Sequence, residues 1–358
     1  MAKGGYRGGM PMGMGGKNQM QMMKQAQKMQ QDLLKMQEEM ESREYEATAG
    51  GGVITAVVSG KRELVRVNEA LHEKSYANIA DKIVAHSARA VLVAGPSSSG
   101  KTTSANRLAT QLRVLGQDPK MLSLDNYYLD RDAIPADENG QKDLEHINTL
   151  DISRFSSDLA ALMRGEQVEV PVFDFLTGKR AKEGIVMQLH PDEPLIIEGI
   201  HALNPMLLND DIDRDKLFRV YVSALTTLNI DDHNRIHTTD ARLLRRLVRD
   251  YETRGASMEH TLSMWPSVRR GEEKWIFPYQ ENADALFNTT LVYEVSVLKK
   301  YVYPLLQEVP KESPCYAAAR DITKVLNYFL DADGIEDEIP PTSILREFIG
   351  GCTFYRKD

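Results

Sequence analysis

Residues 90–103 read Ala90-Val91-Leu92-Val93-Ala94-Gly95-Pro96-Ser97-Ser98-Ser99-Gly100-Lys101-Thr102-Thr103. The first five residues are apolar and predict a buried strand, and residues 104–115 after the loop are compatible with a helix. Glycines between a strand and a helix let backbone N–H groups close around phosphate oxygens at the helix N-terminus. A plain Gly/Ser turn is the alternative, but the flanking strand and helix favour a nucleoside triphosphate site.

Each part of this loop has an expected role toward a bound triphosphate. Lys101 is expected to reach the outer phosphates, and the Thr102 hydroxyl is placed to hold Mg²⁺. The residues predicted to contact the triphosphate are Gly95, Ser97, Ser98, Ser99, Gly100, Lys101, Thr102 and Thr103.

Composition limits the class of protein. The 358 residues are 42% hydrophobic, which suits one large α/β domain with an appendage. Two cysteines, Cys315 and Cys352, cannot build a disulfide framework or a zinc cluster. The sequence has neither a signal-peptide pattern nor a long apolar span, so we expect a cytoplasmic protein without a membrane partner. A net charge of −8 argues against a broad nucleic-acid surface.

The first sixty residues differ from the rest. Residues 1–17 are rich in Gly and Met and predict a flexible tail, whereas residues 18–46 predict a long helix, followed by a break at 49–52 and a strand at 53–59. The apolar seam of the helix is formed by Met22, Ala26, Met29, Leu33, Met36 and Met40. This seam either docks on its own domain or pairs with a second chain, and the second interpretation predicts a homo-oligomer.

Two carboxylates end apolar strands further along the chain. Asp125 follows the stretch 121–124, and Glu198 ends the stretch 194–198. In a parallel sheet the carboxyl ends of the strands face the ligand crevice. Asp125 is therefore a candidate base for a hydroxyl acceptor and Glu198 a candidate Mg²⁺ ligand opposite Thr102, although a turn residue and a solvated side chain are the simpler alternatives.

Four arginines predict a second phosphate-binding element. Arg242, Arg245, Arg246 and Arg249 fall on one face of a helix at about 100° per residue. Guanidinium groups crowded in this way repel unless an anion binds between them. We expect a helical lid over the triphosphate that excludes water, or else a solvated basic face.

The order of these motifs resembles the uridine kinase and phosphoribulokinase group of P-loop kinases, from about residue 63 to the C-terminus. Further matching segments are 171–175, 265–274 and 283–288. The resemblance implies a doubly wound α/β fold with a five-stranded parallel sheet, and transfer of the γ-phosphoryl group of ATP with Mg²⁺ to a hydroxyl. Lys101, Asp125, Arg246 and Arg249 are the implied catalytic residues, and the predicted acceptor contacts are Tyr127, Glu145, Phe173 and Arg254.

The acceptor pocket departs from that family's pattern. Uridine kinases carry a ribose-binding Asp in a Phe-Asp-His sequence, where this chain has Leu144-Glu145-His146. Their polar pyrimidine contacts are matched here by Phe173, Gly178 and Met264. Losing hydrogen-bonding groups removes discrimination, by about 10⁴-fold in favourable cases. We therefore expect the acceptor to be a nucleoside of the uridine or cytidine type or a related sugar or polyol.

The N-terminal part resembles the YbaB/EbfC nucleoid-associated proteins over about residues 1–60, on the segments 1–5, 22–30 and 49–53. We therefore predict a tail at 1–17, a helix-strand segment at 18–62 and a kinase domain at 63–358, in a fusion of two pieces. A DNA-binding adaptor with a nucleotide-regulated domain is the second hypothesis. Residues 1–46 carry seven basic and six acidic side chains, which disfavours tight phosphate-backbone binding. A GTPase lacks support, since the Asn-Lys-x-Asp signature does not occur.

Overall fold

The computed structural model describes residues 44–49, 54–59, 61–134, 143, 145–175, 177–226, 228–229, 235–332 and 334–355. Contacts between Cα atoms divide the chain into two units, residues 1–64 and 65–358. Within the described ranges no helix has the length and apolar character needed to cross a membrane.

In the first unit, β1 (Glu44–Ala49) and β2 (Ile54–Ser59) form an antiparallel pair in which Glu46 lies opposite Val57. The expected strand at 53–59 is confirmed by β2. The expected helix at 18–46 is wrong at its end, because residues 44–46 belong to β1, where they pair with the next strand instead of continuing a helical seam. Residues 18–43 lie outside the described residues.

The second unit is built on a five-stranded parallel sheet in the order β11-β10-β3-β9-β4, as the fold class predicted. Its strands are β3 (Ala90–Ala94), β4 (Lys120–Ser123), β9 (Leu195–Glu198), β10 (Leu217–Ser223) and β11 (Ala285–Asn288). The phosphate-loop strand β3 is central, and all five of its residues are buried. A run buried on both faces needs apolar side chains at every position, which explains its lack of alternation.

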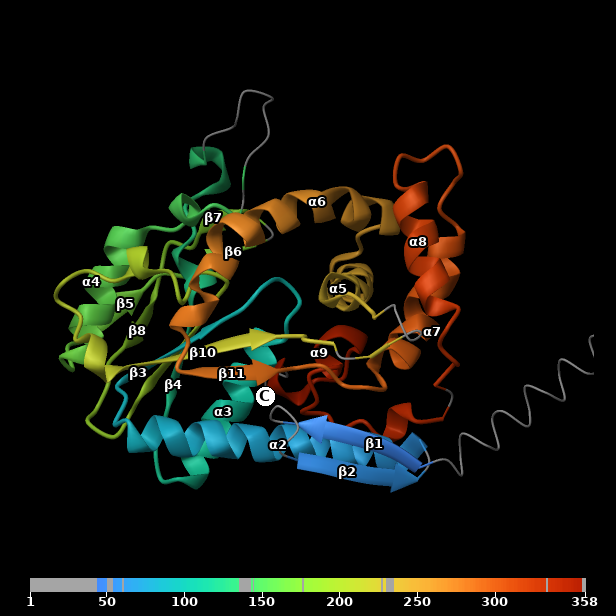
Figure 1. Ribbon diagram of the computed structural model, residues 1–358. Helices are drawn as coiled ribbons and strands as arrows, with labels where there is room; N and C mark the ends of the chain where they lie inside the picture. Colours follow the sequence, from blue (N-terminus) through green and yellow to red (C-terminus); the bar gives the residue numbers. More distant parts are fainter. Residues whose placement is uncertain are drawn as a thin grey trace, which may run out of the picture. The chain divides into compact units, whose positions relative to one another are not determined.

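Helices pack on the sheet and beyond its carboxyl end. They are α2 (Lys61–Ala85), α3 (Lys101–Val114), α4 (Ile152–Met163), α5 (Thr238–Arg254), α6 (Met258–Trp275), α7 (Glu294–Gln307), α8 (Tyr316–Leu326) and α9 (Arg346–Ile349). Figure 1 shows α5 and α9 past the arrowheads of β10 and β11, where α5 contacts α6, α7 and α9. Between α4 and β9 in the sequence, the chain forms two small antiparallel strand pairs. These are β5 (Val168–Val170) with β8 (Ile185–Met187), and β6 (Phe173–Asp174) with β7 (Lys179–Arg180).

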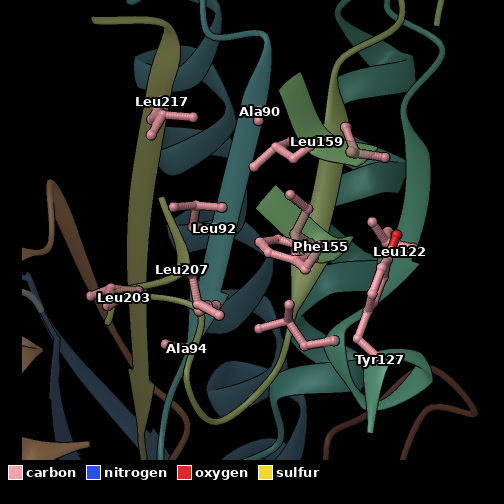
Figure 2. Close-up of a cluster of buried hydrophobic side chains, with 14 of the residues drawn as sticks. Ala90, Leu92, Ala94, Leu122, Tyr127, Phe155, Leu159, Leu203, Leu207 and Leu217 are labelled. Atoms are coloured by element: carbon pink, nitrogen blue, oxygen red, sulfur yellow. The ribbon is translucent and has the colours of Figure 1, made fainter. Parts of the chain in front are cut away.

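The main hydrophobic core lies against one face of the sheet (Figure 2). Leu92 of β3 and Leu217 of β10 belong to the same cluster as Phe155 and Leu159 of α4. Burying a side chain of this size contributes about 1.5–3 kcal/mol. The core therefore holds the strand ends in register, and the loops that leave those ends are placed by it.

A buried polar network joins α2, α3 and the C-terminal segment. Arg107 of α3 forms ion pairs with Glu69 and Glu73 of α2 at 3.4 and 2.7 Å. Glu69 also accepts hydrogen bonds from the hydroxyls of Tyr293 and Ser343 at 2.7 and 2.6 Å. Since Ser343 lies shortly before α9, which begins at Arg346, this network fixes the end of the chain beside the helix that follows the phosphate loop.

Candidate active site

The phosphate loop connects β3 to α3 with little room on either side. A Cβ on Gly95 would lie 1.9 Å from the carbonyl oxygen of Val222 in β10. Gly100 has a φ of +86°, a backbone conformation that residues with a Cβ rarely adopt. It is the last residue before α3 begins at Lys101. These two glycines let the loop pass close to the neighbouring strand and then turn into the helix.

Gly95→Ala tests this close approach. The added methyl group overlaps a strand carbonyl, so either the loop or β10 must move, at a cost of about 1–3 kcal/mol. We expect ATP affinity, measured by titration calorimetry, to fall about tenfold or more. Gly116→Ala is the control, because an added Cβ there meets no atom within 4 Å. Its φ of +84° strains the turn after α3, so this variant is expected to lose stability but to keep its ATP affinity. Unchanged affinity in Gly95→Ala would contradict the need for this packing.

One cavity of about 270 Å³ brings most of the predicted residues together. The predicted residues that line it are Ser97, Ser98, Gly100, Lys101, Thr102, Asp125, Glu145, Glu198, Arg246, Arg249 and Arg254. Tyr128, Gly199, Ile200 and Glu347 complete its lining. Gly95, Ser99 and Thr103 do not line the cavity: Gly95 packs behind the loop, Ser99 is fully buried, and Thr103 is hydrogen-bonded to Glu347.

Cations and carboxylates face each other in this cavity. Burial lowers the pKa of Lys101, while Glu198 and Asp125 act in the opposite direction. The Lys101 ammonium donates a hydrogen bond to the carbonyl of Pro96 at 3.0 Å. Burial also lowers the pKa of Arg249, and Arg254 lowers it further. Cations that burial destabilises in this way gain the most from an anionic ligand.

The buried Glu198 and the half-buried Asp125 form an acidic pair. Burial is the largest cause of the raised pKa of both carboxyls, and the charge of Asp125 raises that of Glu198 further. Glu198 accepts hydrogen bonds from the hydroxyls of Ser123 at 2.9 Å and Thr102 at 3.4 Å. A cation beside Glu198 and Thr102 would relieve the repulsion between the Glu198 and Asp125 carboxylates.

These oxygen ligands fit Mg²⁺, which binds through one or two protein carboxylates and keeps its remaining positions for water and phosphate. The described residues contain no group of three or more His, Cys, Asp or Glu side chains that could hold a metal. A protein site made of the Thr102 hydroxyl and the Glu198 carboxylate suits an ion that takes most of its ligands from phosphate and water.

The four arginines of α5 divide into two pairs with different surroundings. Arg246 donates to the Ser97 hydroxyl at 3.0 Å and Arg249 donates to the Ser98 hydroxyl at 3.2 Å, so both reach the cavity side of the loop. Arg242 and Arg245 are buried behind the loop. The expectation that all four arginines cover the triphosphate is therefore corrected to two.

The buried pair supports the loop through its backbone. Arg242 forms an ion pair with Glu272 of α6 and donates to the Ser97 carbonyl at 3.0 Å. Glu272 in turn accepts a hydrogen bond from the Ser97 backbone N–H at 3.0 Å. Arg245 pairs with Glu294 at the start of α7 and donates to the Thr289 hydroxyl at 3.0 Å. All four arginines lie on the same face of α5. The two pairs differ in burial, because Arg242 and Arg245 are buried and Arg246 and Arg249 line the cavity.

A second cavity of about 150 Å³ adjoins the first and shares Tyr128 and Glu145 with it. Its other lining residues are Leu129, Arg131, Ile134, Phe173 and Phe175. The rings of Phe173 and Phe175 lie edge to face with centroids 5.2 Å apart. Burial raises the pKa of Glu145 to about 7, and the nearby Arg246 lowers it. Gly178 packs against Arg131, while Met264 lines neither cavity.

The prediction that Tyr127 contacts the acceptor is corrected by the structure. Tyr127 is fully buried in the hydrophobic core, and its hydroxyl donates to Asp158 of α4 at 3.0 Å (Figure 2). The 3₁₀ turn at Leu124–Tyr127 rotates successive side chains, so Tyr128 lines the cavities instead. The neighbouring residue carries the same ring, and no signal in the sequence separates the two.

Glu347 is one of the cavity residues outside the predicted set, and it is the one that lies furthest from the loop along the sequence. The stretch 343–349 predicts a packed terminal helix, and α9 confirms it only at 346–349. The Glu347 carboxylate contacts Thr103, which lies 244 residues earlier in the chain.

Comparisons with known proteins give two family matches and several similar kinases. The model of the Phosphoribulokinase / Uridine kinase family matches residues 90–296, and that of the YbaB/EbfC DNA-binding family matches residues 14–103. The chain is 32% identical to a uridine kinase of Staphylococcus epidermidis and 31% identical to one of Staphylococcus aureus, each over 54% of this chain and 84% of the relative. A solved structure named "Possible Uridine Kinase", from Bacillus stearothermophilus, is 20% identical, with a TM-score of 0.40 over 60% of this chain and 98% of that one.

The second family match runs further than the resemblance at about 1–60, into residues that form α2, β3 and the phosphate loop. The first match covers more than half of the chain, including β3, the loop, both carboxylates and α5. The chain therefore belongs to the phosphoribulokinase/uridine kinase family and is a P-loop phosphotransferase that acts on a hydroxyl acceptor.

Proposed function

We propose that this chain transfers the γ-phosphoryl group of ATP to a hydroxyl of a small metabolite, a nucleoside of the uridine or cytidine type or a related sugar or polyol. One observation carries the proposal. A cavity lined by the phosphate loop, Asp125 and three arginines adjoins an aromatic cavity, with Tyr128 and Glu145 shared between them. A phosphate donor and an acceptor can thus occupy neighbouring spaces, which transfer between them requires.

Asp125 is proposed as the base that takes the acceptor proton. It lies in the donor cavity, and its half-buried carboxylate is a stronger base than a fully exposed one because desolvation raises its pKa. Lys101, Arg246 and Arg249 are proposed to bind the phosphate oxygens and to stabilise the charge that develops on them.

Thr102 and Glu198 are the residues proposed to hold Mg²⁺, which neutralises phosphate charge when it is bound. Serine hydroxyls of the loop, backbone N–H groups and the start of α3 would hold the remaining phosphate oxygens. Water is limited on this side, because the buried arginines of α5 close the back of the loop.

The acceptor is proposed to lie between Glu145 and the aromatic residues. Phe173 and Phe175 offer faces and edges to an apolar or planar group, while the Glu145 carboxylate suits sugar hydroxyls. Arg254 lines the donor cavity and pairs with Asp250 at 2.9 Å, from which it could turn to the acceptor. This pocket has fewer polar groups than pyrimidine selection needs, which supports a broader acceptor class.

The experiment is release of ADP from ATP and Mg²⁺ across uridine, cytidine, other nucleosides, pentoses and polyols. Lys101→Met serves as the control for contaminating kinases, since it removes the cation from the phosphate cavity. Stimulation by at least one hydroxylated compound, absent in Lys101→Met, is the expected result. Equal rates with and without every acceptor would contradict the proposed activity.

A second candidate function concerns the N-terminal part, because the DNA-binding family model matches residues 14–103. We propose the boundaries 1–17, 18–62 and 63–358 for tail, helix-strand segment and kinase domain. In this second candidate, residues 18–62 pair two chains and bring DNA to the kinase. Binding of duplex DNA that is lost on deletion of residues 1–46, along with a smaller oligomer in light scattering, would support it.

A further inference from the structure

Glu347 is near the end of the described chain, yet its carboxylate lies in the phosphate cavity. Oε2 accepts hydrogen bonds from the Thr103 hydroxyl at 2.7 Å and from the Thr103 backbone N–H at 3.4 Å. Oε1 lies 3.7 Å from Nη1 of Arg249, and the side chain is only 10% exposed. One carboxylate thus contacts three donor groups around the loop.

These donors are ones that a phosphate-binding loop offers to its nucleotide. Thr103 is the third residue of α3, and backbone N–H groups at such a helix start cradle the inner phosphates. Glu347 also raises the pKa of Lys101 and of Arg249, which means that its charge is already partly neutralising both cations. A phosphate bound at the same donors would meet a carboxylate of like charge.

The residues on either side of Glu347 are firmly held. Ser343 donates to Glu69 at 2.6 Å, and the Ile344 side chain lies 2.8 Å from the position of a Cβ on Gly100. The ring of Phe348 is fully buried, with the guanidinium carbons of Arg245 and Arg249 at 5.3 and 5.9 Å from its centroid. Because the segment is anchored at both sides, the Glu347 side chain can leave the donors by rotating while the backbone stays in place.

We propose that the Glu347 carboxylate occupies part of the nucleotide's phosphate position and must be displaced when ATP binds, so that it holds the affinity of the chain for nucleotide down. The inference rests on the proposed function, because it takes ATP as the ligand of this cavity. The segment that carries Glu347 lies beyond residues 90–296, so it is a feature of this chain outside the matched family region.

The experiment measures the dissociation constant of ATP by titration calorimetry, without acceptor, for the full chain and for Glu347→Gln. Glutamine keeps the length of the side chain and removes its charge. Since like charges brought together cost several kcal/mol, we expect Glu347→Gln to bind ATP about tenfold tighter or more. Glu312→Gln, at an exposed position, is the matched control and is expected to bind as the unsubstituted chain does.

Glu347→Ala is the second variant, used if the glutamine disturbs folding in a thermal melt, and its binding is expected to tighten as well. Affinity that is unchanged or weaker in the folded variants would overturn the inference, and weaker binding would make Glu347 a contact of the nucleotide. If neither the unsubstituted chain nor any variant binds ATP, the proposed function fails along with the inference. Binding to the unsubstituted chain with no gain in Glu347→Gln rejects the inference alone.

Discussion

Asp125→Asn is expected to lower kcat by about 10²-fold or more while the dissociation constant of ATP stays nearly unchanged. Asparagine preserves the size of the side chain but cannot take a proton from the acceptor hydroxyl. The phosphate donors Lys101, Arg246 and Arg249 are left in place, which is why the effect should fall on the chemical step. Steady-state kinetics with the best acceptor of the panel, combined with ATP titration, separate the two quantities.

Asp192→Asn is the control for this variant, because it makes the same chemical change at an exposed position away from the cavity. The control should retain full turnover. Turnover of Asp125→Asn within a few-fold of the unsubstituted chain would remove Asp125 from the mechanism. A large loss of ATP affinity would instead assign Asp125 to the donor.

The second large effect is on stability. Arg245→Met leaves the Glu294 carboxylate buried without its partner, and breaking a buried pair in this way costs about 3–5 kcal/mol of unfolding free energy. Arg245 is completely buried and also donates to the Thr289 carbonyl at 2.8 Å, so several polar groups lose a partner together. Chemical denaturation followed by circular dichroism measures the loss.

The loss should depend on pH in a definite direction. Burial already raises the pKa of Glu294, and Arg245 lowers it, so the variant's Glu294 will have a still higher pKa. Between the unfolded pKa and that raised value, the folded variant binds a proton that the unfolded chain does not. Its stability therefore increases as pH falls through this range, and the deficit is smaller at pH 5 than at pH 8.

Two further variants test the cause. Arg320→Met makes the same replacement at an exposed position and should change stability by no more than about 0.5 kcal/mol. Replacing Arg245 and Glu294 together by methionine removes both charges, and it should recover much of the loss. If the free energy of unfolding of Arg245→Met lies within about 1 kcal/mol of that of the unsubstituted chain, the Arg245–Glu294 pair does not stabilise the fold as we infer.

Several features were predictable because they depend on residues close together in the sequence. The apolar run at 90–94 and the glycines after it specify a strand, a loop and a helix, and the structure has β3, the loop and α3 there. The strand that ends at Glu198 was recognised in the same way, as was the arginine helix at 238–254. Each depends on local periodicity and turn chemistry, which neighbouring residues determine.

The sequence patterns did not predict which of these side chains are buried and which line the cavity. The four arginines share one helical face, yet Arg242 and Arg245 are buried in ion pairs and Arg246 and Arg249 reach the cavity. Their difference depends on Glu272 and Glu294, which lie 30 and 49 residues further along the chain. The choice between Tyr127 and Tyr128 depends likewise on how one turn packs against α4.

The sequence by itself determined the phosphate loop and the strands that end in carboxylates, because turn chemistry and hydrophobic periodicity act over a few residues. The parallel sheet that joins these strands was implied by the family resemblance, since its strand pairs link segments as distant as β3 and β10. Only the tertiary structure decided which side chains face the cavity and that Glu347 reaches Thr103 from 244 residues away. Those contacts are set when distant segments close on one another and bury their charges, and no local pattern records where such segments meet.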